Sequence, residues 1–90
     1  MNGIVHKRKI RTRWYDDVRS GLKTWEVRIN DRPEGFRVGD LIELDPVYDN
    51  GSRCANAKVW PPLRVEITYV AADVPGLDPN YVVLGIEVVK

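Results

Sequence analysis

Hydrophobic and polar residues alternate without a break from residue 24 to residue 30. Because successive side chains of a β-strand point to opposite faces, this pattern predicts a strand with two different faces. One face carries Trp25, Val27 and Ile29, and we expect Trp25 to lie in the core. The other face carries a row of charged and hydrogen-bonding groups: Thr24, Glu26, Arg28 and Asn30. Such a row is either an ordinary solvated surface or the floor of a binding cleft.

The same kind of pattern divides the rest of the chain into short elements. It predicts further strands over residues 4–10, 41–47, 63–71 and 81–89, a helix over 12–20, and a short edge piece over 57–60. Pro33 and Gly35 mark one loop, Asn50 and Gly51 mark another, and a turn-rich segment covers 73–80. The expected order is therefore one strand, one helix and four further strands.

The predicted helix has signals at both of its ends. Thr12 is the expected N-cap, and Gly21 follows the last turn, where a positive φ is common. Trp14 and Val18 are four residues apart, so we expect them to form the stripe that faces the core. A helix this short depends on tertiary packing for its stability.

The length and the predominance of strands indicate the fold class. Ninety residues are enough for one domain, so the predicted domain spans residues 1–90. A small sheet removes its exposed edges by closing on itself. We therefore predict an α+β, mainly β fold: a small β-barrel of about five strands with one or two short helices.

Charge is distributed unevenly along the chain, although the net charge is only +1. Residues 1–37 carry ten Lys and Arg against five Asp and Glu, whereas residues 38–90 carry four against eight. A basic segment is typical of proteins that bind polyanions, because neutralised phosphates release counterions. Lys7, Lys9 and Arg11 are the candidate phosphate contacts. An ordinary solvated surface is the alternative explanation of the same charges.

Composition argues against several other kinds of site and location. The single Cys54 excludes an internal disulfide, and one histidine with one cysteine cannot form a four-ligand zinc site, so no metal or other cofactor is expected. Cys54 has no obvious partner base and is not a candidate nucleophile. No apolar run approaches the roughly 20 residues that span a bilayer, and no signal-peptide core follows the N-terminal charges. We therefore expect a cytoplasmic monomer without membrane contact.

The polar row of residues 24–30 offers the groups that recognise an unpaired base. Arg28 presents a planar fork of donors, and Glu26 accepts hydrogen bonds from an exocyclic amine. An aromatic surface and nearby positive charge complete such a site. The aromatic candidates are Trp14, Tyr15, Trp25 and Phe36. The alternative is a Glu26–Arg28 ion pair that only fixes the register of the barrel.

A series of motifs, in the same order, resembles the ASCH domain, a branch of the PUA-like superfamily. The motifs are His6 with Lys9-Ile10, the Gly-x-Lys-x-x-Glu-x-Arg signature over 21–28, Asn30-Asp31-Arg32, Phe36, Val38-Gly39-Asp40, and the tail over 76–84. The resemblance covers nearly the whole chain and is closest to a small bacterial and phage family of ASCH-like proteins without an assigned function. Residues 53–62 depart from the pattern and look like an insertion.

This resemblance implies a PUA-like β-barrel with a cleft beside the signature strand. It also implies that the protein binds RNA, in single-stranded form, or a nucleotide base within it. The expected ligand contacts are Lys23, Glu26, Arg28, Asn30 and Arg32, with Lys7, Lys9 and Arg11 along the phosphates. This function requires no catalysis.

Two other functions stay open. One similar branch hydrolyses the amide of an acetylated cytidine, which implies a nucleoside amidohydrolase or a ribonuclease-like enzyme with Lys23, Thr24 and Glu26 as catalytic residues. His6, the only histidine, is a further candidate base, although a lone histidine on a first strand is more often structural. The third function is a protein-interaction module in which the loop at residues 60–62, Trp-Pro-Pro, docks a partner.

Overall fold

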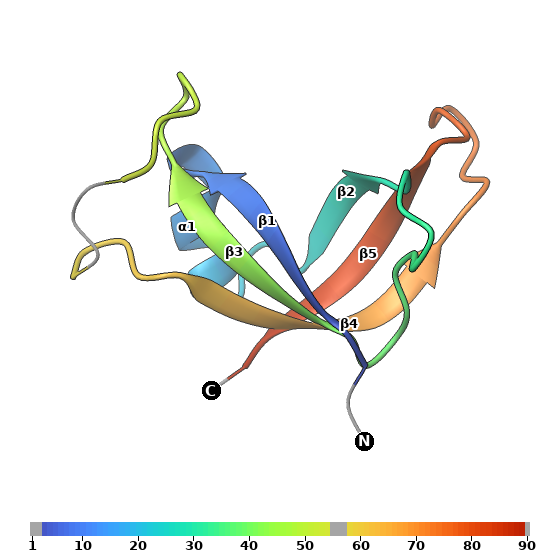
Figure 1. Cartoon of the computed structure of the whole chain (residues 1–90), viewed down its shortest axis with the longest axis horizontal. Helices are drawn as coiled ribbons and strands as arrows, with labels where there is room; N and C mark the ends of the chain where they lie inside the picture. The colour runs from blue at the N-terminus through green and yellow to red at the C-terminus, as the bar shows by residue number, and fades with distance from the viewer. Residues whose placement is uncertain (1–2, 55–57, 90) are drawn as a thin grey trace.

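The computed structural model describes residues 3–54 and 58–89. Its elements follow the predicted order of strand, helix and four strands (Figure 1). They are β1 (Val5–Arg11), α1 (Thr12–Arg19), β2 (Trp25–Ile29), β3 (Leu41–Val47), β4 (Leu63–Ala71) and β5 (Tyr81–Val88). The predicted bounds of β3 and β4 are confirmed, and the other elements differ by one residue at one or both ends. The predicted edge piece is wrong: residues 58–60 form a turn, and residue 57 lies outside the described residues.

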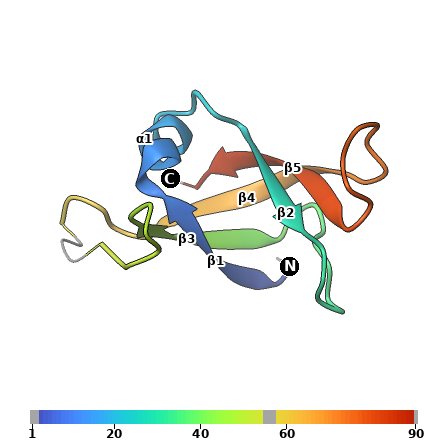
Figure 2. The ribbon, with the colours of Figure 1, turned by 90° about the horizontal axis from the view of Figure 1, so that it is seen from above.

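The five strands form one mixed sheet in the order β1-β3-β4-β5-β2. β1 pairs in parallel with β3, and the other neighbouring strands are antiparallel. The sheet curls into a half-barrel in which β4 runs beneath, while β1 and β2 rise on opposite sides (Figures 1 and 2). This architecture confirms the predicted mainly β, α+β fold. In the described part of the chain, β1 and β2 are the two edges of the sheet, so they form the rims of its opening.

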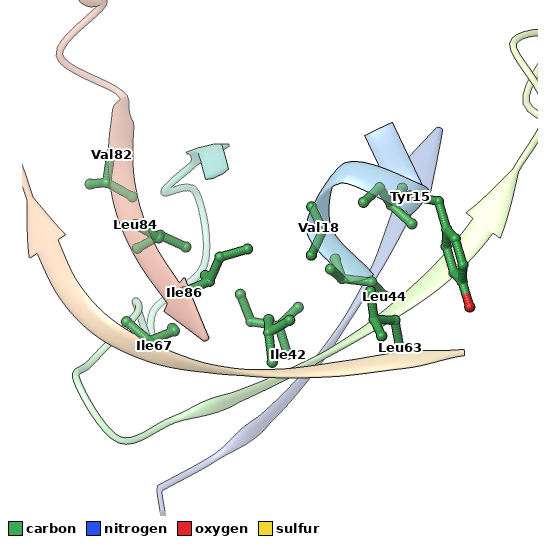
Figure 3. Close-up of a cluster of buried hydrophobic side chains, with 11 residues drawn as sticks. Tyr15, Val18, Ile42, Leu44, Leu63, Ile67, Val82, Leu84 and Ile86 are labelled. Atoms are coloured by element: carbon green, nitrogen blue, oxygen red, sulfur yellow. The ribbon is translucent and has the colours of Figure 1, made fainter. Parts of the chain in front are cut away.

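The hydrophobic core lies on the concave side of the half-barrel. Ile42, Leu44, Val65, Ile67 and Leu84 project from the three central strands, and none of their surface is exposed. Along these strands buried residues alternate with more exposed ones, as expected for a sheet with one packed and one solvated face. Figure 3 shows how the inward side chains of the three strands gather on one side of the sheet.

The helix α1 covers one end of this core. It contributes Tyr15 and Val18, which Figure 3 shows near Leu44 and Leu63. The prediction that Trp14 forms the stripe with Val18 is wrong, because Trp14 is 42% exposed and Tyr15 is fully buried. Residues three and four apart share a helix face, so the spacing from Val18 fits either aromatic residue equally well.

The prediction for the ends of α1 is confirmed at the C-terminal end only. Thr12 is the first helical residue rather than the cap, since the helix begins directly after β1 and Arg11 occupies the N-cap position without a side-chain hydrogen bond. Gly21 has a φ of 85° after the last turn, as expected. No helix within residues 3–54 and 58–89 is long and apolar enough to cross a membrane.

Candidate functional site

The strand β2 turns its polar row toward the inside of the half-barrel. Glu26 is 5% exposed, whereas Trp25, Val27 and Ile29 are 51%, 39% and 44% exposed. The predicted alternation is confirmed, but the expectation that Trp25 lies in the core is wrong. Alternation separates the two faces of a strand without deciding which face turns inward. At this rim the inner face meets β1 across the opening.

Glu26 lies at the centre of a charge network on this inner face. The Nζ of Lys23 donates a hydrogen bond to Oε1 of Glu26, and Arg28 donates to Oε2 from Nε at 3.1 Å and from Nη2 at 2.8 Å. Both cations are partly buried beside the buried carboxylate. The network therefore keeps one excess positive charge in a place that water screens poorly, where an anion is attracted strongly.

The guanidinium of Arg28 also joins the two rims of the sheet. Its Nη2 donates to the backbone carbonyl oxygen of Lys9, on β1, at 2.8 Å. Within the described residues, β1 and β2 are not neighbours in the sheet. This side-chain contact therefore joins two strands that main-chain pairing does not connect.

A cavity of about 300 Å³ lies beside this contact, and we call it the edge cavity. Its lining residues are Lys9, Ile10, Arg11, Trp14, Glu26, Val27, Arg28, Val47, Tyr48 and Gly51. Two half-exposed aromatic rings, Trp14 and Tyr48, thus share a cavity with the Glu26–Arg28 pair. An aromatic surface beside fixed donors and acceptors suits a flat ligand with polar edges.

Two tryptophan rings lie near the ammonium group of Lys23. Its Nζ lies 4.5 Å from the ring centre of Trp25 and 5.6 Å from that of Trp14, within the range of cation–π attraction. Among the aromatic residues that the sequence indicated for stacking, Trp14 lines the edge cavity and Trp25 does not. Tyr15 is fully buried and cannot stack on a ligand.

The other ligand residues predicted on and after β2 lie at the surface. Arg32 is exposed in the loop that follows the strand, and it lines a second cavity together with Arg28. Asn30 is exposed at the end of the strand, and its backbone N–H donates to the carbonyl of Asn80 at 2.7 Å. The structure therefore brings together Lys23, Glu26 and Arg28, with Arg32 close to the same opening and Asn30 outside both cavities.

The candidate phosphate contacts Lys7, Lys9 and Arg11 alternate along β1 and are all exposed. In the parallel register, Lys7 lies opposite Glu43 and Lys9 opposite Asp45. Opposite charges on neighbouring strands attract each other on the shared face. The basic run of β1 is therefore partly balanced by β3.

The three candidate catalytic residues do not share one cavity. Thr24 precedes β2, is exposed, and lines a larger cleft of about 760 Å³ between α1 and the strands β4 and β5. Lys23 lines that cleft too, whereas Glu26 lines the edge cavity. Thr24 and the carboxylate that would have to assist it therefore line different cavities.

A second buried polar cluster, which the sequence did not predict, lies between β1 and the start of β3. Nε2 of His6 is 2.8 Å from Oδ2 of Asp40, and both residues are 2% exposed. Asp40 also accepts hydrogen bonds from the backbone N–H groups of Ile4 and Arg37. Burial raises the pKa of Asp40, but the hydrogen bonds from His6 and the two amides outweigh it, so the pKa lies below its ordinary value. The ring centres of His6 and Phe36 lie 4.7 Å apart. These contacts fit a structural role for His6.

The loop before β4 folds back onto the helix. Trp60 packs edge-on against Tyr15, with ring centres 5.1 Å apart, and the hydroxyl of Tyr15 donates to the carbonyl oxygen of Pro61. Trp60 is half-buried against the core. It is therefore not the exposed anchor that a protein-interaction module would need.

Candidate metal ligands do not gather in the described part of the chain. Residues 3–54 and 58–89 contain no group of three or more His, Cys, Asp or Glu that could hold a metal ion. Cys54 is a half-buried free thiol. The candidate site is thus defined by the Glu26 network and the cavities beside it.

Fold and site together define a small α+β half-barrel domain with a charged opening between its edge strands. The family model of a domain of unknown function, DUF3850, matches residues 5–86, and the chain belongs to this family. The crystal structure of the hypothetical protein PH0355 has a similar fold, with a TM-score of 0.59 and 14% sequence identity, covering 94% of this chain and 99% of that chain. At this identity the likeness concerns the fold alone. No curated protein matches the chain in sequence.

Proposed function

We propose that this domain binds single-stranded RNA, or a nucleotide base within it, in the edge cavity between β1 and β2. One observation carries the proposal: Trp14 and the Glu26–Arg28 pair line the same cavity of about 300 Å³. RNA-binding proteins hold unpaired bases by stacking and by hydrogen bonds to the edges of the base. The series of motifs between residues 6 and 84 supports the assignment to the ASCH domain and the PUA-like superfamily, which is part of the same proposal. The proposal also takes the protein to be a cytoplasmic monomer.

The cavity offers each kind of contact that a base requires. Trp14 supplies a stacking surface. Arg28 uses Nε and Nη2 for its contacts with Glu26 and Lys9, which leaves the donors of Nη1 for a ligand. Oε2 of Glu26 already accepts two hydrogen bonds, but Oε1 accepts only one and keeps a lone pair for a ligand. The polar pair can therefore read donors and acceptors on a base edge at once.

Positive charge around the cavity supports a polyanion as the ligand. Lys9, Arg11 and Arg28 line it against the single carboxylate of Glu26. Contacts of this kind with phosphates release counterions, so binding is expected to weaken as salt rises.

The test is a titration of a fluorescent single-stranded RNA at low and at moderate salt, with the wild type beside Arg28→Ala. We expect saturable, salt-sensitive binding, and a loss of affinity of about tenfold or more in the variant, since a charge-assisted hydrogen bond is removed. Arg19→Ala removes an exposed arginine of α1 outside the cavity and is expected to bind like the wild type. Circular dichroism checks that each variant is folded. Binding that ignores salt, or that survives the loss of both Arg28 and Lys23, contradicts the proposal.

Hydrolysis of a modified nucleoside has weaker support. Lys23 contacts Glu26, as an acid–base pair would, but Thr24 lines a different cleft. Incubation of acetylated cytidine at high protein concentration tests this alternative. Turnover that disappears in Lys23→Ala would make the domain an enzyme.

A further inference from the structure

A second cavity, of about 390 Å³, adjoins the edge cavity, and Lys9 and Arg28 line both. Six of its eight lining residues are Lys or Arg, and two are acidic. We call it the arginine cavity, after Arg8, Arg28 and Arg32, which line it from β1, from β2 and from the loop after β2.

The two acidic residues of the arginine cavity have other partners. Asp45 pairs with Arg53 at 3.2 Å, and Glu43 pairs with Arg64 at 3.3 Å. Among residues 3–54 and 58–89, no carboxylate lies within ion-pairing distance of the guanidinium groups of Arg8 or Arg32. The cavity therefore contains two arginines that the protein does not neutralise by direct contact.

Arg8 is held in a defined position on the inner face of β1. Its Nη1 donates to the carbonyl oxygen of Lys7 at 2.8 Å, and its guanidinium carbon lies 5.3 Å from the ring centre of Phe36. Arginine commonly stacks on an aromatic ring in this way and keeps its remaining donors available. A group fixed before binding loses less conformational entropy when a ligand arrives.

The guanidinium of Arg8 lies close enough to those of Arg32 and Arg28 to be repelled by both. Burial lowers the pKa of Arg8 below its ordinary value, and repulsion from Arg32 and Arg28 lowers it further. Asp31 and Glu34 act in the opposite direction without reversing the effect. An anion between the guanidinium groups would relieve this repulsion, so the cluster favours an anionic ligand.

We propose that the arginine cavity is a phosphate subsite, in which Arg8, Arg28 and Arg32 hold the phosphate of a nucleotide whose base occupies the edge cavity. This inference rests on the proposed function. Guanidinium forks match the spacing of phosphate oxygens and form charge-assisted hydrogen bonds with them. Because Arg28 lines both cavities, base and phosphate are held on either side of one residue. A free nucleotide and an RNA strand supply the same phosphate chemistry.

The test compares calorimetric titrations of the four ribonucleosides with those of their 5′- and 3′-monophosphates and of a short single-stranded RNA. We expect at least one monophosphate to bind about tenfold or more tightly than its nucleoside. Arg8→Ala and Arg32→Ala should reduce this ratio toward one. Arg32 is exposed in a loop, so its variant remains informative if Arg8→Ala does not fold. Arg19→Ala, at an exposed arginine of α1 that lines neither cavity, should keep the ratio.

The other outcomes separate this inference from the proposed function. Equal binding of nucleosides and monophosphates would overturn the phosphate subsite and leave base binding intact. If RNA binds and monophosphates do not, a loss of RNA affinity in Arg32→Ala but not in Arg19→Ala would support the subsite with the strand as the phosphate source. Unchanged RNA binding in both variants would overturn it. If nucleosides, nucleotides and RNA all fail to bind, both proposals fall.

Discussion

Arg28 and Lys9 connect the two rims of the half-barrel: Nη2 of Arg28, on β2, donates to the carbonyl oxygen of Lys9, on β1, at 2.8 Å. The same guanidinium binds Glu26 and lines both the edge cavity and the arginine cavity. One side chain therefore bridges the opening and also presents a donor to it. A ligand bound in either cavity as proposed would contact the group that joins the two edge strands, so we expect its binding to increase the local order of β1 and β2.

Removal of the Glu26 carboxylate is expected to destabilise the domain strongly. Glu26→Ala leaves Lys23 and Arg28 partly buried without their counter-ion, and breaking such a network from one side costs about 3 kcal/mol. Urea unfolding of the variant beside the wild type measures the loss. Glu26→Gln keeps the shape of the side chain and some of its hydrogen bonds, so its free energy of unfolding should lie between those of the wild type and Glu26→Ala. A loss below about 1 kcal/mol for Glu26→Ala would show that the network does little for stability.

Trp14→Ala should weaken RNA binding without unfolding the domain. Stacking of a base on an aromatic side chain contributes about 1–3 kcal/mol, so we expect a loss of about tenfold. The half-exposed ring contributes little to the core, and the unfolding midpoint should change only slightly. Trp25→Ala is the matched control, because Trp25 is similarly exposed but does not line the edge cavity. Equal effects of the two substitutions on affinity would contradict stacking in that cavity.

The stability of the domain should fall at acidic pH through Asp40. Its pKa in the folded state lies below its ordinary value, so the folded state favours the ionised carboxylate. This contribution is complete above the unfolded pKa of about 3.9 and is lost as the pH falls through the lower folded pKa. Urea unfolding at pH 7, 5 and 3 measures the difference in the free energy of unfolding between the wild type and Asp40→Asn. This difference should become smaller only at the lowest pH. A difference that does not change with pH would contradict this role of Asp40.

Tyr15→Phe should destabilise the domain by about 1 kcal/mol, the usual contribution of one hydrogen bond. The ring that packs on Trp60 is kept, and only the hydrogen bond from the hydroxyl to Pro61 is lost. Burial also raises the pKa of Tyr15, so the wild type should lose stability as the pH rises from about 10 toward the folded pKa. Chemical unfolding at pH 7 and pH 10.5 measures both effects. Identical curves for wild type and variant at both pH values would show that the hydroxyl contributes nothing.

Local signals in the sequence were enough to predict the elements and their order. The strands over 41–47 and 63–71 were predicted to the residue, because each ends at turn residues and alternates in hydrophobicity. The mainly β fold followed from the number of strands and the length of the chain. Within the candidate site, the alternation of β2 was enough to place Glu26 and Arg28 on one face.

Other features depend on contacts between distant parts of the chain. Tyr15 rather than Trp14 enters the core because of how α1 packs against β1 and β3, and helical spacing alone does not distinguish the two residues. His6 and Asp40 are 34 residues apart in the sequence. The only local signal for their contact was the position of Asp40 directly after the turn at Val38 and Gly39.

The sequence by itself therefore determined which residues form strands and which polar groups share a strand face, because these properties repeat over a few neighbouring residues. Only the tertiary structure decided that the polar face of β2 turns inward and that Arg28 reaches Lys9. The order β1-β3-β4-β5-β2 and the curl of the sheet bring the two edge strands face to face, and both arise from pairings between segments far apart in the chain.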